Sequence, residues 1–195
     1  MNWANRLTLG RLALTILFVA ALSSSWRYGR TVALLLFLLA GLTDYFDGEI
    51  ARRYGIITKF GKLMDPLVDK VMMAAAFICL VPLRAVPAWV ATIVVARDFL
   101  ITGLRLLASS EGQVLPAERL GKHKTSWQIV TVIFFLALLS AREIRPTTGQ
   151  EAWWQDAWGY GGNALLWITI GLTISSGLGY LWRHRGLILP VGAGA

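Results

Sequence analysis

The sequence predicts an all-α membrane protein with six transmembrane helices and both termini in the cytoplasm. Of its 195 residues, 56% are hydrophobic and only 15% are charged, whereas soluble domains carry about 25% charged residues. Apolar runs of about 20 residues, the length that a spanning helix needs, recur along the chain. Lys and Arg lie mainly at the ends of these runs. An ordinary soluble domain is therefore excluded.

Six segments are predicted to span the membrane: residues 7–24, 31–52, 62–82, 87–108, 123–141 and 162–182. They form a single membrane domain over residues 1–182, and residues 183–195 form a cytoplasmic tail. The first 25 residues have the basic start and apolar run of a signal peptide, but no small-x-small cleavage site precedes Trp26. We therefore predict that this segment is retained as the first helix.

The second and third helices carry acidic residues at the ends that face each other in the sequence. The segment 31–52 is apolar up to Thr43 and then polar, so Asp44 and Asp47 fall near its far end. The third segment opens with Asp65 and Pro66. Proline is tolerated in the first turn of a helix but bends or breaks its interior. Pro66 thus either starts this helix or lies in one that has already begun.

The fourth, fifth and sixth segments hold the other conspicuous polar residues. Arg97 and Arg105, eight residues apart, share one face of segment 87–108, whereas the adjacent Arg97 and Asp98 are expected to diverge. Segment 162–182 carries small residues at four-residue intervals, a pattern that lets helices approach closely. We expect this face to pack within the chain and keep a homodimer as the alternative; its residues are Gly171, Ser175 and Gly179.

Charge asymmetry predicts the orientation in the membrane. Eleven of the 19 Lys and Arg residues lie on the side shared by both termini, and five lie on the other side. The positive-inside rule places the richer side in the cytoplasm. The net charge of +8 does not indicate nucleic acid, because these residues flank apolar runs and form no patch interleaved with aromatic side chains. We interpret the net positive charge as a consequence of the orientation in the membrane and of an anionic substrate.

Four carboxylates between Gly41 and Lys70 are the strongest candidate site. Each acidic pair lies on one face of its helix, because its members are three or four residues apart. Charged side chains at membrane depth mark functional sites. Four converging carboxylates oppose one another's ionisation unless a cation is present. The residues Asp44, Asp47, Asp65 and Asp69 therefore predict a site for a hard divalent cation, Mg²⁺ or Mn²⁺, with two ions expected.

The spacing of these residues resembles the signature of the CDP-alcohol phosphotransferase family. The sequence reads Asp44-x2-Asp47-Gly48-x2-Ala51-Arg52-x8-Gly61-x3-Asp65-x3-Asp69. The opening NRLTLGR and the stretches ARDFLITGLR and GKHKTSWQ resemble the phosphatidylglycerophosphate synthase branch of this family. The resemblance covers roughly residues 4–140.

The resemblance implies transfer of a phosphatidyl group from CDP-diacylglycerol to sn-glycerol 3-phosphate at a bacterial inner membrane, with the active site facing the cytoplasm. Asp69 would be both metal ligand and general base. The donor would contact Asn5, Thr8, Arg11, Asp44, Asp47, Gly48, Ala51, Arg52 and Gly61. The acceptor phosphate would meet Arg97, Arg105, Lys122 and Lys124.

Two alternatives remain open at this point. The acceptor could be inositol phosphate or phosphatidylglycerol, within the same family. A divalent-cation transporter would also use intramembrane carboxylates, but it should place them near the midplane and on both sides. All four carboxylates here cluster toward one end.

Overall fold

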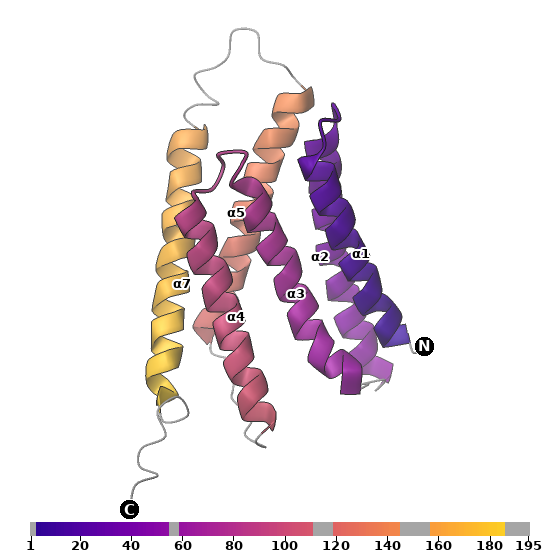
Figure 1. Cartoon of the computed structure of the whole chain (residues 1–195), viewed down its shortest axis with the longest axis vertical. Helices are drawn as coiled ribbons and strands as arrows, with labels where there is room; N and C mark the ends of the chain where they lie inside the picture. The colour runs from indigo at the N-terminus through magenta and orange to yellow at the C-terminus, as the bar shows by residue number, and fades with distance from the viewer. Residues whose placement is uncertain (1–2, 55–58, 111–118, 145–156, 186–195) are drawn as a thin grey trace, which may run out of the picture.

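Six long α-helices run side by side and alternate in direction (Figure 1). The computed structural model describes residues 3–54, 59–110, 119–144 and 157–185, and this part of the chain contains no β-strand. The helices are α1 (Trp3–Ser23), α2 (Gly29–Tyr54), α3 (Lys59–Leu80), α4 (Ala88–Ser110), α5 (Arg119–Ile144) and α7 (Asn163–Arg183), and the π-helix η1 (Ala157–Gly162) leads into α7.

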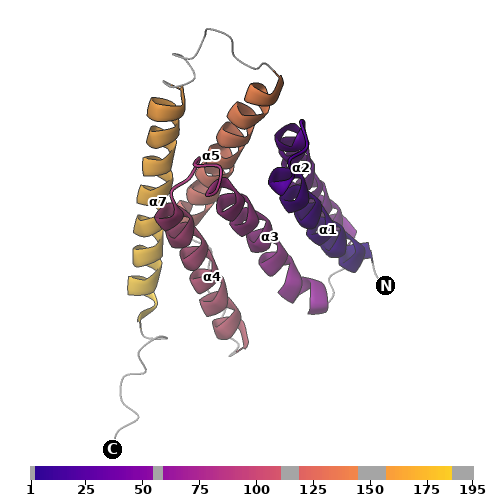
Figure 2. The same cartoon turned by 45° about the horizontal axis from the view of Figure 1, so that its top comes forward.

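Helix α1 packs against both α2 and α3, and α5 packs against α2 and α7. Helix α4 packs against α3 and α7 and completes the bundle (Figure 2). The start of α1 and the end of α7 lie at the same end of the bundle (Figure 1). The end of α2, the start of α3, the end of α4 and the start of α5 lie at that end as well. This is the arrangement that the sequence predicts for both termini on one side; the cytoplasmic location of that side stays a prediction.

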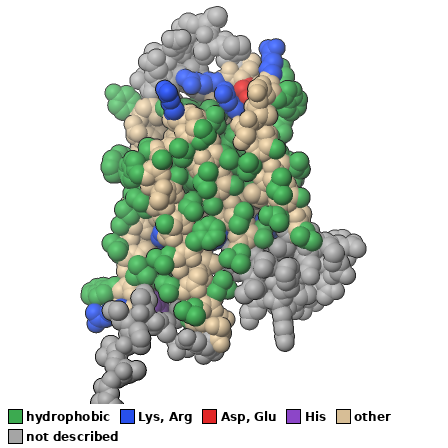
Figure 3. All heavy atoms as spheres, viewed as in Figure 1, with side chains coloured by type: hydrophobic (Ala, Val, Ile, Leu, Met, Phe, Trp, Pro, Cys, Tyr) green, Lys and Arg blue, Asp and Glu red, His purple; other side chains and the backbone are tan. Residues whose placement is uncertain are grey.

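The interior and much of the outer face are both apolar. Phe18, Phe77, Val132 and Leu136 are fully buried in the core. Large apolar side chains also cover the visible flank, while Lys and Arg gather mainly toward the ends (Figure 3). Two helical stretches, Lys124–Ile144 and Trp158–Arg183, are long and apolar enough to cross a membrane.

The predicted helices agree with the observed ones to within four residues at each end. The prediction of an all-α chain with six long helices is confirmed for the described residues; the crossing of a membrane by all six stays a prediction. Pro66 lies seven residues inside α3, so the helix has already begun before the proline. The sequence did not predict η1, where Gly162 packs so closely that an added Cβ would lie 2.9 Å from Phe135.

The small-residue face of the last helix is not used as predicted. Gly171, Ser175 and Gly179 are exposed, and an added Cβ on either glycine would meet nothing within 4 Å. The prediction of packing within the chain is therefore wrong. The helix instead buries the face that contains Thr169, Thr173 and Tyr180. On this face the Thr169 hydroxyl pairs with that of Thr131, and the Tyr180 hydroxyl accepts from Arg105.

A carboxylate from α5 fixes the first turn of α2. The Glu143 side chain accepts hydrogen bonds from the backbone N–H groups of Arg30 and Thr31, both at 2.9 Å, and from the Thr31 hydroxyl at 2.9 Å. An anion at a helix N-terminus satisfies N–H groups that have no partner within the helix. This contact anchors α2, whose other end carries Asp44 and Asp47.

Candidate active site

The aspartate motif occupies the adjoining ends of α2 and α3. Asp44 and Asp47 lie in the last turns of α2, and Asp65 and Asp69 lie in the first half of α3. Both stretches are helical, as the spacing argument requires. The structure describes their backbone only, so the side chains of these residues lie outside the described part.

The helix registers bring the acidic residues of α3 to the same depth as the arginines of α4. Asp69 lies eleven residues from the end of α3, and Arg97 lies nine residues from the start of α4. Asp65 lies fifteen residues from the end of α3, and Arg105 lies seventeen residues from the start of α4. At about 1.5 Å per residue, each pair agrees in depth to within roughly 3 Å. Each aspartate of α3 thus lies at about the depth of one arginine of α4.

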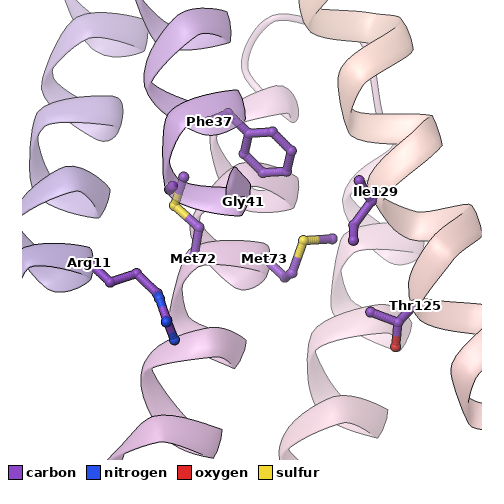
Figure 4. A pocket seen from close by; sticks show the side chains of 8 residues that line it. Arg11, Phe37, Gly41, Met72, Met73, Thr125 and Ile129 are labelled. Atoms are coloured by element: carbon purple, nitrogen blue, oxygen red, sulfur yellow. The ribbon is translucent and has the colours of Figure 1, made fainter. Parts of the chain in front are cut away.

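A pocket of about 120 Å³ lies between α1, α2, α3 and α5, close to the motif (Figure 4). Its lining is mostly apolar and includes Phe37, Met72, Met73 and Ile129. The Arg11 guanidinium and the Thr125 hydroxyl both point toward the lower side of the view in Figure 4. This pocket is where the structure places Arg11, a residue predicted to contact the donor.

The pocket adjoins the motif on both helices. Gly41 in its wall precedes Asp44 by three residues, and Met72 follows Asp69 by three. Residues three apart on a helix lie one above the other. Lining residues of the pocket therefore lie about one helical turn from the motif on both helices.

A buried ion-pair cluster joins α4, α5 and α7 beside this region. Asp98 is 4% exposed and Lys124 is 1% exposed, and the Lys124 ammonium donates to the Asp98 carboxylate. Arg97 places Nη1 3.3 Å from the same carboxylate oxygen, and its Nη2 donates to the Ser176 hydroxyl at 3.1 Å. Buried charges need such partners, because removal from water disfavours an isolated ion.

The contact between Arg97 and Asp98 corrects one prediction. Adjacent residues on a helix point in different directions, so these two side chains were expected to diverge. The arginine side chain is long enough to turn back to its neighbour, and the buried carboxylate attracts it.

The second arginine of α4 lies on a buried tyrosine. Arg105 donates from Nε to the Tyr180 hydroxyl at 3.4 Å, and its guanidinium lies 5.2 Å from the centre of the Tyr180 ring. Tyr180 is 1% exposed. The hydrogen bond and the cation–π contact together fix where this guanidinium lies.

The sequence analysis gave no role to Asp98, Ser176 or Tyr180. Asp98 had a usable signal, since an acidic residue inside an apolar run requires a partner. Ser176 and Tyr180 had none, because hydroxyl groups are common in membrane helices and only the packing of α7 on α4 brings these two to the arginines.

Several predicted residues can be placed only by their backbone. Asn5 and Thr8 lie in the first turns of α1, and Lys122 lies in the first turn of α5. The remaining ones are in the motif helices: Gly48, Ala51, Arg52 and Gly61. Their side chains fall outside the described part of the chain, so their roles stay predictions.

The donor set of the motif fits a hard divalent cation. All four candidate ligands are carboxylates, which supply the oxygen atoms that Mg²⁺ and Mn²⁺ prefer. They lie on two helix ends that start from one short junction, residues 55–58. No other acidic cluster of ligand size exists among the side chains that the structure describes.

Comparison with known proteins identifies the family of the chain. Residues 1–175 match the sequence model of the CDP-alcohol phosphatidyltransferase family. A Bacillus subtilis protein named CDP-diacylglycerol–glycerol-3-phosphate 3-phosphatidyltransferase is 38% identical over 143 residues, which cover 67% of this chain and 74% of that protein. A Rickettsia felis protein with the same name is 34% identical over 179 residues, covering 92% and 93%.

A third relative bears a related name. A Mycobacterium tuberculosis protein named probable phosphatidylglycerophosphate synthase is 40% identical over 142 residues, which cover 71% of this chain and 68% of that protein. The family match spans all four aspartates and both arginines of α4. The chain belongs to the CDP-alcohol phosphatidyltransferase family.

Proposed function

We propose that the chain transfers the phosphatidyl group of CDP-diacylglycerol to sn-glycerol 3-phosphate and yields phosphatidylglycerophosphate and CMP, a step of glycerophospholipid biosynthesis. The observation that carries this proposal is the alignment, over two thirds or more of each chain, with relatives whose names state this reaction. Membership of a phosphatidyltransferase family argues against the transporter alternative.

The donor would bind at the ends of α1, α2 and α3. Its acyl chains would lie in the bilayer, and its cytidine diphosphate suits the polar ends of these helices. The cations that would balance its pyrophosphate are Arg11 and Arg52, and the uncharged residues near it are Asn5, Thr8, Gly48, Ala51 and Gly61. Glycines allow the backbone to approach a phosphate closely.

The four aspartates Asp44, Asp47, Asp65 and Asp69 would hold Mg²⁺ or Mn²⁺. When bound, such ions neutralise the pyrophosphate and stabilise the leaving phosphate. The acidic residues themselves fix the position of that charge at the adjoining ends of α2 and α3. Their mutual repulsion makes the site dependent on a counter-ion.

Asp69 is our candidate general base. Its carboxylate accepts the proton of the acceptor hydroxyl, whose oxygen then forms a bond to the phosphorus that carries the diacylglycerol. The bond between this phosphorus and the bridging oxygen of the pyrophosphate breaks, and CMP leaves with the electron pair. Atoms and charge balance without any further reactant.

The acceptor phosphate would lie between α4 and the start of α5. Arg97, Arg105, Lys122 and Lys124 are the cations we assign to it. Lys124 also pairs with Asp98, and Arg97 lies beside the same carboxylate. Cations from two helices suit the phosphate of the acceptor, because hydrogen bonds between charged partners are the strong ones.

We place this chain in the bacterial inner membrane, with the end that carries both termini and the motif in the cytoplasm. The exposed apolar flank and the excess of Lys and Arg at the motif end support this placement. The outward face with Gly171, Ser175 and Gly179 would be available for a homodimer.

The test is CMP release by the purified chain from CDP-diacylglycerol. We expect release that depends on sn-glycerol 3-phosphate and not on inositol phosphate or phosphatidylglycerol. Preference for either of the other two acceptors would leave the family assignment intact and refute the assignment of the acceptor.

A further inference from the structure

One turn of α7 makes three separate contacts with the two arginines of α4. Ser176 and Gly177 contact Arg97, and Tyr180 contacts Arg105. The arginines are eight residues apart on α4, whereas their outermost contacts on α7, Ser176 and Tyr180, are only four residues apart. The contact points therefore converge on a single turn. These three residues lie just beyond residues 1–175, which match the family model.

The Ser176 hydroxyl is oriented as an acceptor. Its proton is directed to backbone carbonyl groups of α7, because Oγ donates to the Leu172 carbonyl at 2.6 Å, with the Thr173 carbonyl at 3.2 Å. A hydroxyl has one proton and two lone pairs. The oxygen can therefore only accept from Arg97 Nη2, at 3.1 Å, and this fixes one edge of the guanidinium.

Gly177 gives the stem of Arg97 room to lie on the helix backbone. A Cβ at this position would be 3.1 Å from Arg97 Cγ and 3.7 Å from Nε. Two other glycines of the same helix, Gly171 and Gly179, have open space where a Cβ would be. The absence of a side chain therefore matters at Gly177 and not at these two positions.

Tyr180 holds Arg105 in two ways. Its hydroxyl accepts from Nε at 3.4 Å, and its ring lies 5.2 Å from the guanidinium carbon. Its own position is set by complete burial. None of the three residues of α7 carries a charge, so any influence on an anionic ligand must act through the arginines.

We propose that residues 176–180 of α7 are a positioning element that sets the affinity for the phosphate of the acceptor by fixing the guanidinium groups of Arg97 and Arg105. This inference rests on the proposed function, which assigns the acceptor phosphate to these arginines. A guanidinium that is already oriented loses less rotational freedom when it binds a phosphate. Ser176, Gly177 and Tyr180 are thus positioning residues and not catalytic ones.

The experiment compares three variants with three matched controls in the purified full-length chain. The variants are Ser176→Ala, Gly177→Ala and Tyr180→Phe, and the controls are Ser175→Ala, Gly171→Ala and Tyr160→Phe. Ser175, Gly171 and Tyr160 have the same side chains but are exposed and touch neither arginine. The measurements are kcat, the KM for each substrate and the melting temperature, with the phosphate-bearing acceptor that the wild-type chain prefers.

We expect each variant to raise the acceptor KM by about three- to tenfold, in line with a weakened contact to a charged group. The KM for CDP-diacylglycerol should stay within about twofold of the wild type. A variant that only reduces the amount of folded enzyme would instead lower kcat and change neither KM. The controls should match the wild type. Ser176→Thr keeps the hydroxyl and should retain most of the acceptor affinity.

Failure of this inference is distinguishable from failure of the proposed function. If Arg97→Ala and Arg105→Ala raise the acceptor KM but Ser176→Ala and Tyr180→Phe do not, the positioning role is refuted and the acceptor site survives. A fall in melting temperature with both KM values unchanged would reduce these residues to a structural role. If the arginine variants also leave the acceptor KM unchanged, both ideas fall together.

Discussion

At the scale of single residues, the buried pair of Asp98 and Lys124 is the least expected feature. The sequence shows each residue in an otherwise apolar helix, but nothing in it pairs a residue of α4 with one of α5. The structure makes them partners, since the Lys124 ammonium donates to the Asp98 carboxylate. Lys124 thus has a structural partner in addition to the role predicted for it.

Removal of one member of this pair should destabilise the fold strongly. Asp98→Asn leaves the Lys124 ammonium buried without its carboxylate, which costs about 3 to 5 kcal/mol. Denaturant unfolding in lipid–detergent micelles measures this loss. The double variant Asp98→Asn with Lys124→Met should recover part of the stability, since no buried charge of the pair remains. Equal stability of Asp98→Asn and wild type would contradict the pairing.

The candidate general base gives a second prediction at this scale. Asp69→Asn should lower kcat by about 10² to 10⁴, the usual contribution of a general base, while CDP-diacylglycerol still binds. Asp156→Asn, which changes a carboxylate far from the motif in the sequence, serves as the control. Steady-state CMP release measures both. Retention of more than about a tenth of the activity by Asp69→Asn would disprove the assignment.

At the scale of helices, the sequence predicted the elements well and their mutual contacts poorly. Apolar runs of membrane length give the helix bounds to within four residues, because a helix satisfies its own backbone groups. The faces were harder to predict. Gly171, Ser175 and Gly179 look like a packing face, yet α7 buries its opposite side. Small residues allow close packing but do not select a partner helix.

The anchor of α2 offers a test at this scale. Glu143→Ala removes the acceptor of three hydrogen bonds from Arg30 and Thr31. We expect a loss of about 1 to 3 kcal/mol in unfolding free energy, because the N–H groups of the first turn lose their partner. Glu143→Gln keeps one carbonyl oxygen and should lose less. If Glu143→Ala unfolds at the wild-type denaturant concentration, the carboxylate does not anchor the helix.

At the scale of the whole molecule, the fold assembles three parts of a site from distant stretches of the sequence. The aspartates of α2 and α3, the pocket with Arg11, and the arginines of α4 are more than 80 residues apart at the extremes of the sequence. The spacing of the motif alone indicated the aspartates, and resemblance to the family indicated the arginines. The contacts that residues 176–180 of α7 make with these arginines could not be predicted, because they depend on how two helices distant in the sequence pack together.

Metal dependence is the prediction that concerns the site as a whole. Four carboxylates that converge on one site repel one another, so removal of divalent cations should weaken donor binding and stop turnover. EDTA should abolish CMP release, and Mg²⁺ or Mn²⁺ should restore it. Addition of Ca²⁺ in place of Mg²⁺ or Mn²⁺ tests whether the site prefers the smaller ions. Full activity in a buffer freed of metal by chelation would refute the role that we assign to the aspartates.

The most direct test of the central claim follows the acceptor into the lipid. Purified chain is supplied with CDP-diacylglycerol, Mg²⁺ and radiolabelled sn-glycerol 3-phosphate, and lipid-bound label and CMP are counted together. We predict one labelled lipid, phosphatidylglycerophosphate, formed in equal amount to CMP, and none with Asp44→Asn. Release of CMP with no label in the lipid fraction, or equal labelling by Asp44→Asn, would contradict the account.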